Sequence, residues 1–320
     1  MAYPKILDSS GDLLPEPAVA PPARRAGRKG RTAQRRRLPV TLALCFLSLV
    51  AIMAVFAPFI AGLGGWDPYQ FDKSAVDPRM GGLPVGPWGG ISSDHWFGVE
   101  PLNGRDLFAR VVYGARTSVF IAVSATALTT VLGVGLGLLA GFFGGWTDAV
   151  ISRLMDFLLA FPSLIFMIAI LSALPGENRP IMLVVVLSVF SWPAMARVVR
   201  GQAMSLARRE FIDAARASGA GRMATAFREL LPNLSGTIIV MATIQLPTFI
   251  STEAGLSFLG VGVRPPEPSW GQMISSALSW YQSDPMYFAV PGTFLFLTVL
   301  CCMVVGDHIQ SRWSQGGRLG

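Results

Sequence analysis

TSVFIAVSATALTTVLGVGLGLLAGFFGGWT, residues 117–147, contains no Asp, Glu, Lys or Arg in 31 positions. A helix needs about 20 apolar residues to cross the ~30 Å hydrocarbon core of a bilayer. Further uncharged stretches of sufficient or nearly sufficient length are 38–66, 157–176, 180–196, 230–252 and 285–306. The sequence therefore predicts an all-α membrane protein with six transmembrane helices, the third of them kinked at Pro162.

The composition excludes a soluble globular protein. Hydrophobic residues make up 52% of the 320 positions and charged residues only 14%, whereas about 25% of the residues in a typical soluble domain are charged. Cys45, Cys301 and Cys302 lie inside apolar stretches. We therefore expect them to pack as small core residues rather than to form disulfides or a zinc site.

The distribution of basic residues predicts the orientation of the helices. The tail before Leu38 has nine Lys and Arg against three acids, and residues 197–229 have seven Arg against three acids. Residues 67–116 are nearly neutral, with five basic and six acidic residues. Because basic loops stay inside, both termini and the 197–229 loop are predicted to be cytoplasmic, and residues 67–116 extracytoplasmic.

The chain divides accordingly into five predicted segments. They are a disordered basic cytoplasmic tail (1–38), a first transmembrane helix (39–66), an extracytoplasmic segment (67–116), a five-helix membrane core with a loop at 200–232 (117–306), and a cytoplasmic C-terminal tail (307–320). The N-terminal tail is proline-rich and basic, so it cannot bury a core. We expect it to contact anionic membrane lipid. It is not expected to bind nucleic acid, because no fold accompanies the charge.

Motifs for catalysis, cofactors and metals are missing from the sequence. Its three lysines do not complete the Gly-Lys-Ser/Thr loop that holds ATP phosphates, and its two histidines, His95 and His308, are too far apart to form an HExxH site. Residues 135–140 match the dinucleotide pattern GxGxxA, but they lie inside an apolar stretch. Gly133, Gly137 and Gly141 instead predict a smooth helix face for close packing. We therefore predict no catalytic residues, no cofactor and no metal ligands.

The 197–229 loop contains a second type of helix. Residues 210–219 have helical periodicity, with Gly219 as a C-terminal stop and a second helical run starting at Arg222. One small, apolar face is formed by Ala207, Phe211, Ala214 and Ala215. Periodicity alone leaves two interpretations open: docking in the groove of another protein, or an amphipathic helix lying on the membrane.

The order Asp213-Ala214-Ala215, Gly219 and Leu231-Pro232 resembles the EAA loop of bacterial ABC importer permeases. Asp213 replaces the usual Glu, and Glu229 stands where a hydrophobic residue is common. The resemblance implies that this loop forms a coupling helix in a cleft of a separate ATP-hydrolysing subunit. The residues expected to contact that subunit are Phe211, Asp213, Ala214, Ala215, Gly219 and Arg222.

Two further stretches resemble the C-type permease subunit of dipeptide, oligopeptide and nickel importers. One runs from His95-Trp96-Phe97-Gly98 through Gly104-Arg105-Asp106 to residues 113–118, and the other covers 253–260 and 265–271. The resemblance implies a type I importer permease in the bacterial plasma membrane. Its implied partners are a homologous permease, two ATP-binding subunits and an extracytoplasmic peptide-binding protein. It leaves open whether dipeptides, longer peptides, glutathione or a metal chelate are carried.

The same stretches also suggest physical roles. Arg105 and Asp106 are expected to form an opposed charge pair at a turn on the outer surface, which either caps the next helix or receives the binding protein. Glycines and prolines prevent residues 253–271 from forming one continuous helix. Irregular backbone near a membrane must be buried or line a watery cavity, so Glu253, Ser257 and Trp270 are expected to border the translocation path.

An alternative function is a self-sufficient secondary transporter or channel. Such proteins usually place ionisable residues at mid-membrane, and the six uncharged stretches disfavour this. Arg153 and Asp156, at the start of the third predicted helix, are expected to form a structural ion pair instead.

Overall fold

This computed structural model describes residues 29–174 and 178–316, and the chain divides into a unit of residues 1–38 and a unit of residues 39–320. In the first unit the described residues 29–38 already belong to helix α1 (Lys29–Val55). This part contains good helix formers and no proline, although the prediction made residues 1–38 one disordered tail. The remainder of the predicted disordered tail, residues 1–28, lies outside the described residues. All that follows concerns residues 39–320.

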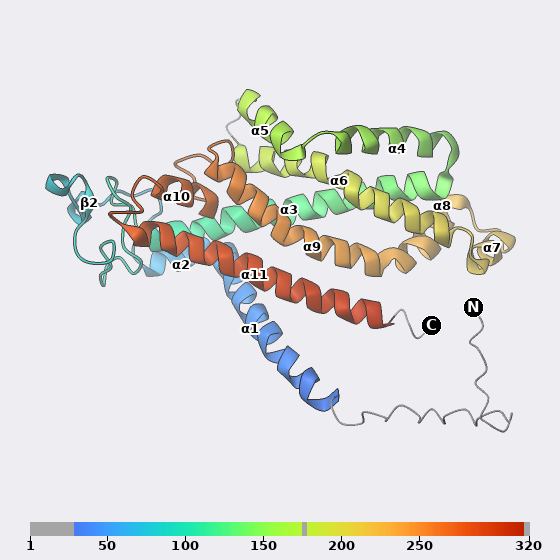
Figure 1. The fold of residues 1–320 in the computed structure, drawn as a ribbon, viewed down its shortest axis with the longest axis horizontal. Helices are drawn as coiled ribbons and strands as arrows, with labels where there is room; N and C mark the ends of the chain where they lie inside the picture. Colours follow the sequence, from blue (N-terminus) through green and yellow to red (C-terminus); the bar gives the residue numbers. More distant parts are fainter. Residues whose placement is uncertain (1–28, 175–177, 317–320) are drawn as a thin grey trace, which may run out of the picture. The chain divides into compact units, whose positions relative to one another are not determined.

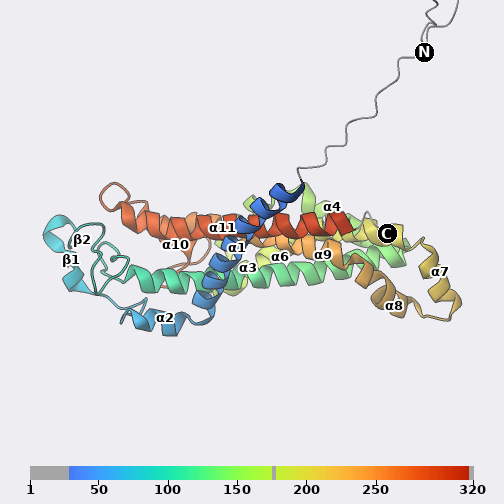
Figure 2. The ribbon, with the colours of Figure 1, turned by 90° about the horizontal axis from the view of Figure 1, so that it is seen from below.

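Long helices lie side by side in Figures 1 and 2: α3 (Leu107–Leu138), α6 (Arg179–Leu206), α9 (Leu231–Phe258) and α11 (Pro285–Gly316). A π-helical turn, Leu139–Phe143, extends α3. Among the described residues, five helices are long and apolar enough to span a membrane, and a sixth span results if one bent pair counts as a single crossing. The predicted all-α membrane fold is confirmed.

The bent pair consists of α4 (Gly145–Ala160) and α5 (Ser163–Ala173), which meet at 85°. The predicted break at Pro162 is confirmed, but the predicted bounds of this third span, 157–176, are wrong. Helix α5 has only 11 residues and reaches about 16 Å, roughly half of the hydrocarbon core. Charged residues in α4 hid its contribution from a search for uncharged stretches.

Those charged residues join α4 to α6. Asp148 Oδ2 accepts a hydrogen bond of 2.8 Å from Arg200 Nη2, and Asp156 Oδ1 lies 2.6 Å from Arg197 Nη2. The predicted ion pair between Arg153 and Asp156 is therefore wrong, because Asp156 pairs with the neighbouring helix.

The glycine face of α3 packs against α6. A Cβ atom on Gly133 would lie 2.5 Å from the Met195 Cβ, and one on Gly141 would lie 2.5 Å from the Arg200 carbonyl oxygen. Because contacts this short leave no room for a side chain, the glycines allow the two backbones to approach closely. This confirms their predicted packing role.

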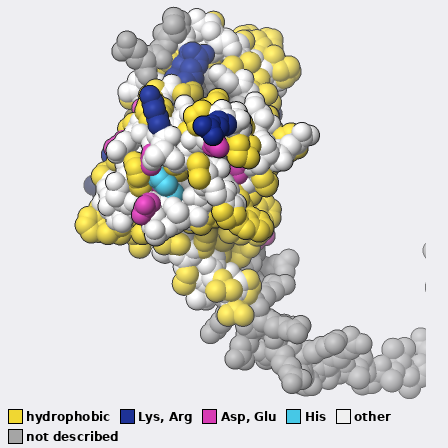
Figure 3. Space-filling model, turned by 90° about the vertical axis from the view of Figure 1, so that its left-hand side faces the viewer, with side chains coloured by type: hydrophobic (Ala, Val, Ile, Leu, Met, Phe, Trp, Pro, Cys, Tyr) yellow, Lys and Arg dark blue, Asp and Glu magenta, His cyan; other side chains and the backbone are white. Residues whose placement is uncertain are grey.

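One end of the 39–320 unit carries the short elements of the 67–116 segment. They are η1 (Lys73–Ala75), η2 (Pro78–Met80) and the antiparallel strands β1 (Val76–Asp77) and β2 (Leu83–Pro84), which pair Val76 with Pro84. Helix α2 (Ala57–Leu63) follows a break at Phe56, so the predicted first helix, 39–66, consists of two helices. Figure 3 shows charged side chains spread among apolar ones on this end face.

The opposite end carries α7 (Glu210–Ala217) and α8 (Arg222–Thr225), followed by a π-helical turn, Ala226–Leu230, that leads into α9. The predicted short helix, its stop and the second helical run are all present. This places the 200–232 loop and the 67–116 segment at opposite ends of the long helices (Figure 2).

Candidate functional site

Asp106 forms the turn that starts α3. Its Oδ1 accepts a 2.7 Å hydrogen bond from the Ala109 backbone N–H, and its Oδ2 lies 2.9 Å from Nδ1 of His95. The other ring nitrogen of His95 lies 3.4 Å from Asp72. Burial raises the pKa of the Asp106 carboxyl, while a hydrogen bond from the Ser74 hydroxyl lowers the pKa of Asp72. The Asp106 carboxylate therefore caps the N-terminus of α3.

Arg105 has a different partner. Its Nε donates a 2.6 Å hydrogen bond to Glu100. The Glu100 carboxylate also lies 2.5 Å from Arg110 and accepts a 3.1 Å hydrogen bond from the Tyr287 hydroxyl. The predicted pairing of Arg105 with Asp106 at the outer surface is therefore wrong. Both side chains are buried, and each has its own partner. Sequence reasoning missed Arg110, because α3 begins ten residues before the uncharged stretch.

Glu253, Ser257 and Trp270 join three helices. The fully buried Glu253 carboxylate accepts hydrogen bonds from Ser118 (2.9 Å) and Ser257 (2.8 Å). Trp270 lies at the start of α10 (Trp270–Ala277), and its indole N–H donates a 3.1 Å hydrogen bond to the Val111 carbonyl. The backbone between α9 and α10 is irregular, as predicted. The structure brings these residues together as a packed junction, and their place beside a translocation path stays a prediction.

Glu253 also changes the expected charge pattern. Helix α9 continues to Phe258, beyond the predicted end at residue 252, so this carboxyl belongs to the helix. The six uncharged stretches disfavoured a secondary transporter, and this buried carboxyl lies one residue beyond the fifth of them. The residue is nevertheless fully hydrogen-bonded to serines of its own chain, which is the arrangement of a structural group.

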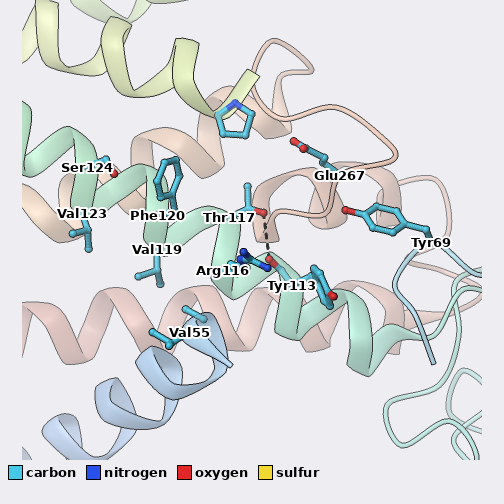
Figure 4. A pocket seen from close by; sticks show the side chains of 12 residues that line it. Val55, Tyr69, Tyr113, Arg116, Thr117, Val119, Phe120, Val123, Ser124 and Glu267 are labelled. Carbon is cyan, nitrogen blue, oxygen red and sulfur yellow. Dashed lines mark hydrogen bonds between the residues drawn. The ribbon is translucent and has the colours of Figure 1, made fainter. Parts of the chain in front are cut away.

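A cavity of about 680 Å³ lies beside α3, the end of α1 and the loop before α10 (Figure 4). Its polar lining consists of Tyr69, Tyr113, Arg116, Thr117, Ser124 and Glu267. Thr117 donates to the Tyr113 carbonyl of its own helix turn, at 3.3 Å. Burial and the negative charge of Glu267 raise the pKa of Tyr69. The Arg116 and Glu267 side chains are exposed.

Helix α7 is anchored on its inner side. Ile212 is fully buried, and Ala207 and Phe211 pack beside it against the ends of α6 and α9. Ala214 is exposed and Ala215 half-buried. The four residues predicted to share one face therefore divide: Ala207 and Phe211 contact their own chain, and Ala214 points outwards.

The turn after α7 is closed by Gly219, which has φ +85°. The Ala220 N–H donates a 3.0 Å hydrogen bond to the Ala215 carbonyl, one of the carbonyl groups that the end of the helix leaves without a partner in the helix. Arg222 then donates 3.2 Å to the Phe143 carbonyl, with its guanidinium 5.1 Å from the Phe143 ring. Arg222 therefore fastens the loop to the end of α3.

The chain matches a known family and several characterised relatives. The family described as "Binding-protein-dependent transport system inner membrane component" matches residues 133–315. The oligopeptide transport system permease protein OppC of Bacillus subtilis (strain 168) is 37% identical, over 83% of this chain and 82% of that protein. The dipeptide transport system permease protein DppC of Alkalihalophilus pseudofirmus is 34% identical, over 93% and 94%.

Two further similarities extend this result. The glutathione transport system permease protein GsiD of Escherichia coli O6:K15:H31 is 37% identical, over 88% of this chain and 87% of that protein. A chain of the inward-facing MetNI methionine ABC transporter has the same fold, with a TM-score of 0.51 and 21% identity over 64% of this chain and 96% of that one. The chain is therefore a multi-pass membrane protein that belongs to the family of binding-protein-dependent transport system inner membrane components.

Proposed function

We propose that this chain is a permease subunit of an ATP-driven peptide importer. It forms the translocation path with a homologous permease, receives peptides from an extracytoplasmic binding protein, and couples to two separate ATP-binding subunits. The names of the relatives support peptides as the substrate class, because oligopeptides, dipeptides and glutathione all contain peptide bonds. ATP hydrolysis takes place on the partner subunits, and this chain contributes no catalytic residue.

The geometry of α7 carries the proposal. Its inner side is held by the fully buried Ile212, while small side chains such as Ala214 leave its outer side open to another protein. A force on this outer side passes through Ile212 to α6 and α9, and through Arg222 to the end of α3. Closure of two ATPases would move the two coupling helices together and switch the permeases from inward-open to outward-open.

The proposed orientation follows the charge distribution. The basic residues of the 200–232 loop and of the N-terminal tail face the cytoplasm with both chain ends, and residues 67–116 face outwards. The placement of this loop and this segment at opposite ends of the long helices supports the orientation. On this basis the outer junction of Arg105, Asp106, Glu253 and Trp270 lies on the side where the binding protein docks.

Transport by the reconstituted complex tests the proposal. Proteoliposomes containing both permeases and both ATPases are loaded with ATP, and the binding protein and a radiolabelled dipeptide are added outside. We expect accumulation that requires ATP and the binding protein. Uptake by this chain alone, driven by an ion gradient without ATP, would contradict the proposal and favour a secondary transporter.

A further inference from the structure

Arg116 and Glu267 place opposite charges in one cavity without pairing them. Arg116 lies on α3, one residue before the uncharged stretch, and Glu267 lies on the loop between α9 and α10. Both are exposed, and within residues 29–174 and 178–316 neither side chain has a hydrogen-bond or ion-pair partner. A charged group at the edge of the uncharged part of a membrane helix is held by water, lipid headgroups or a ligand.

We propose that this cavity is a peptide-binding site, in which Arg116 binds the C-terminal carboxylate and Glu267 the N-terminal ammonium group. The inference rests on the proposed function and names a site for its substrate. Every free peptide carries these two charges whatever its side chains. A site that reads the termini can therefore accept many different sequences.

The remaining lining fits the same ligand. The volume of about 680 Å³ falls within the roughly 300–1,000 Å³ of small-molecule pockets. Val55, Val119 and Phe120 supply an apolar wall for peptide side chains, and Tyr69 and Thr117 supply hydroxyl groups for the peptide backbone. Figure 4 shows these side chains around the cavity, contributed by segments far apart in the sequence.

Charge complementarity favours a zwitterionic peptide over an anionic lipid headgroup. An anionic phosphate would pair with Arg116 but would be repelled by Glu267 in the same cavity. A zwitterionic peptide satisfies both groups. The outer position of Arg116, at the edge of the uncharged stretch, suits a site that a peptide occupies as it enters the path.

The test compares Ala-Leu with its C-terminal amide and its N-acetyl derivative in proteoliposomes containing the complete importer. Because the same binding protein serves every variant, a changed preference between peptides reports on the permease. Arg116→Gln should reduce the preference for the free carboxylate over the amide roughly tenfold to hundredfold, the range for a hydrogen bond to a charged group. Glu267→Gln should reduce the preference for the free amine over the acetylated peptide. Arg116→Lys should retain part of the preference.

Arg264→Gln is the matched control, because Arg264 is exposed on the loop of Glu267 and does not line the cavity. A second measurement cross-links a dipeptide carrying photo-leucine at its C-terminus to the importer. We expect labelling of the α3 segment around Phe120 in the wild type and much less in Arg116→Gln. This result would support the site even if the binding protein rejects the modified peptides.

Four outcomes would overturn the inference. They are an unchanged preference in Arg116→Gln, an equal loss in Arg264→Gln, labelling away from the cavity, and an Arg116 effect that follows the anionic lipid content rather than the peptide termini. In each of these cases wild-type uptake of Ala-Leu leaves the proposed function standing. An importer that takes up no peptide would overturn the proposed function, and this site with it.

Discussion

Gly137→Ala should weaken the packing of α3 against α6. A Cβ at this position would lie 2.7 Å from the Ala196 carbonyl oxygen and 2.8 Å from the Val199 Cβ. Neither atom can rotate away, because one belongs to the backbone and the other is the branch point of a valine. The two helices must therefore separate or bend by a few tenths of an ångström or more.

The magnitude follows from two opposing effects. Adding a methyl group to a well-packed interface costs about 1–3 kcal/mol, while replacing glycine by alanine within a helix returns about 0.5–1 kcal/mol. We expect a net destabilisation of about 1–2 kcal/mol, or roughly a 5- to 30-fold change in the folding equilibrium constant.

Gly135→Ala is the matched control on the same helix. Its Cβ would have no atom within 4 Å, so only the favourable helix term applies. The assay is unfolding of the purified chain in mixed micelles at increasing SDS, followed by tryptophan fluorescence. Gly137→Ala should unfold at a lower SDS fraction than the wild type, and Gly135→Ala at the same or a higher one. The reverse order would refute the packing argument.

Three further predictions concern other parts of the chain. Asp106→Ala should lower the free energy of unfolding by about 1–2 kcal/mol because the helix cap is lost, and Asp106→Asn should lower it by less. Because burial raises the pKa of Asp106, the contribution of this titration to stability is present below pH ~3.9 and decreases as the pH rises through the raised pKa. Asp106→Asn should remove this pH dependence from unfolding curves. In a cysteine-free background, Ser93→Cys should react with an impermeant thiol reagent on intact cells and Ser218→Cys should not; the opposite pattern would reverse the topology. Arg222→Gln should lower the number of peptides transported per ATP hydrolysed, whereas Arg228→Gln, exposed nearby, should not; equal ratios would exclude transmission through Arg222.

The sequence was sufficient to predict the fold class and most helices. Uncharged length identifies a membrane helix wherever lipid or other apolar helices surround it, which is why the starts of α6, α9 and α11 were found within one residue. The helices end 6 to 10 residues beyond the uncharged stretches 180–196, 230–252 and 285–306. The criterion fails where a helix buries charges against its own chain. Arg110 and Glu253 both lie inside helices because Glu100, Ser118 and Ser257 satisfy them.

The candidate sites were harder to predict, because their geometry depends on partners distant in sequence. Arg105 and Asp106 are adjacent, yet their partners, Glu100 and His95, lie on different parts of the preceding loop. Periodicity placed Ala214 and Phe211 on one face of α7, but only the contacts with α6 and α9 decide which of them is covered. The position of Arg116 beside an uncharged stretch was the available signal for the cavity.

The docking of ATPase subunits on α7 is most directly tested by Ala214→Asp. Ala214 is exposed on the outer side of α7, and an unpaired carboxylate buried in a protein contact costs about 3–5 kcal/mol, which weakens docking roughly hundredfold or more. The measurement is the amount of ATPase subunits that co-purify with the permeases in detergent, with Gln310→Asp, exposed near the C-terminal end of α11, as the control. We predict that the Ala214→Asp complex loses its ATPase subunits and retains the homologous permease, while the Gln310→Asp complex retains both. An Ala214→Asp importer that retains its ATPases and transports peptides at the wild-type rate would contradict the account.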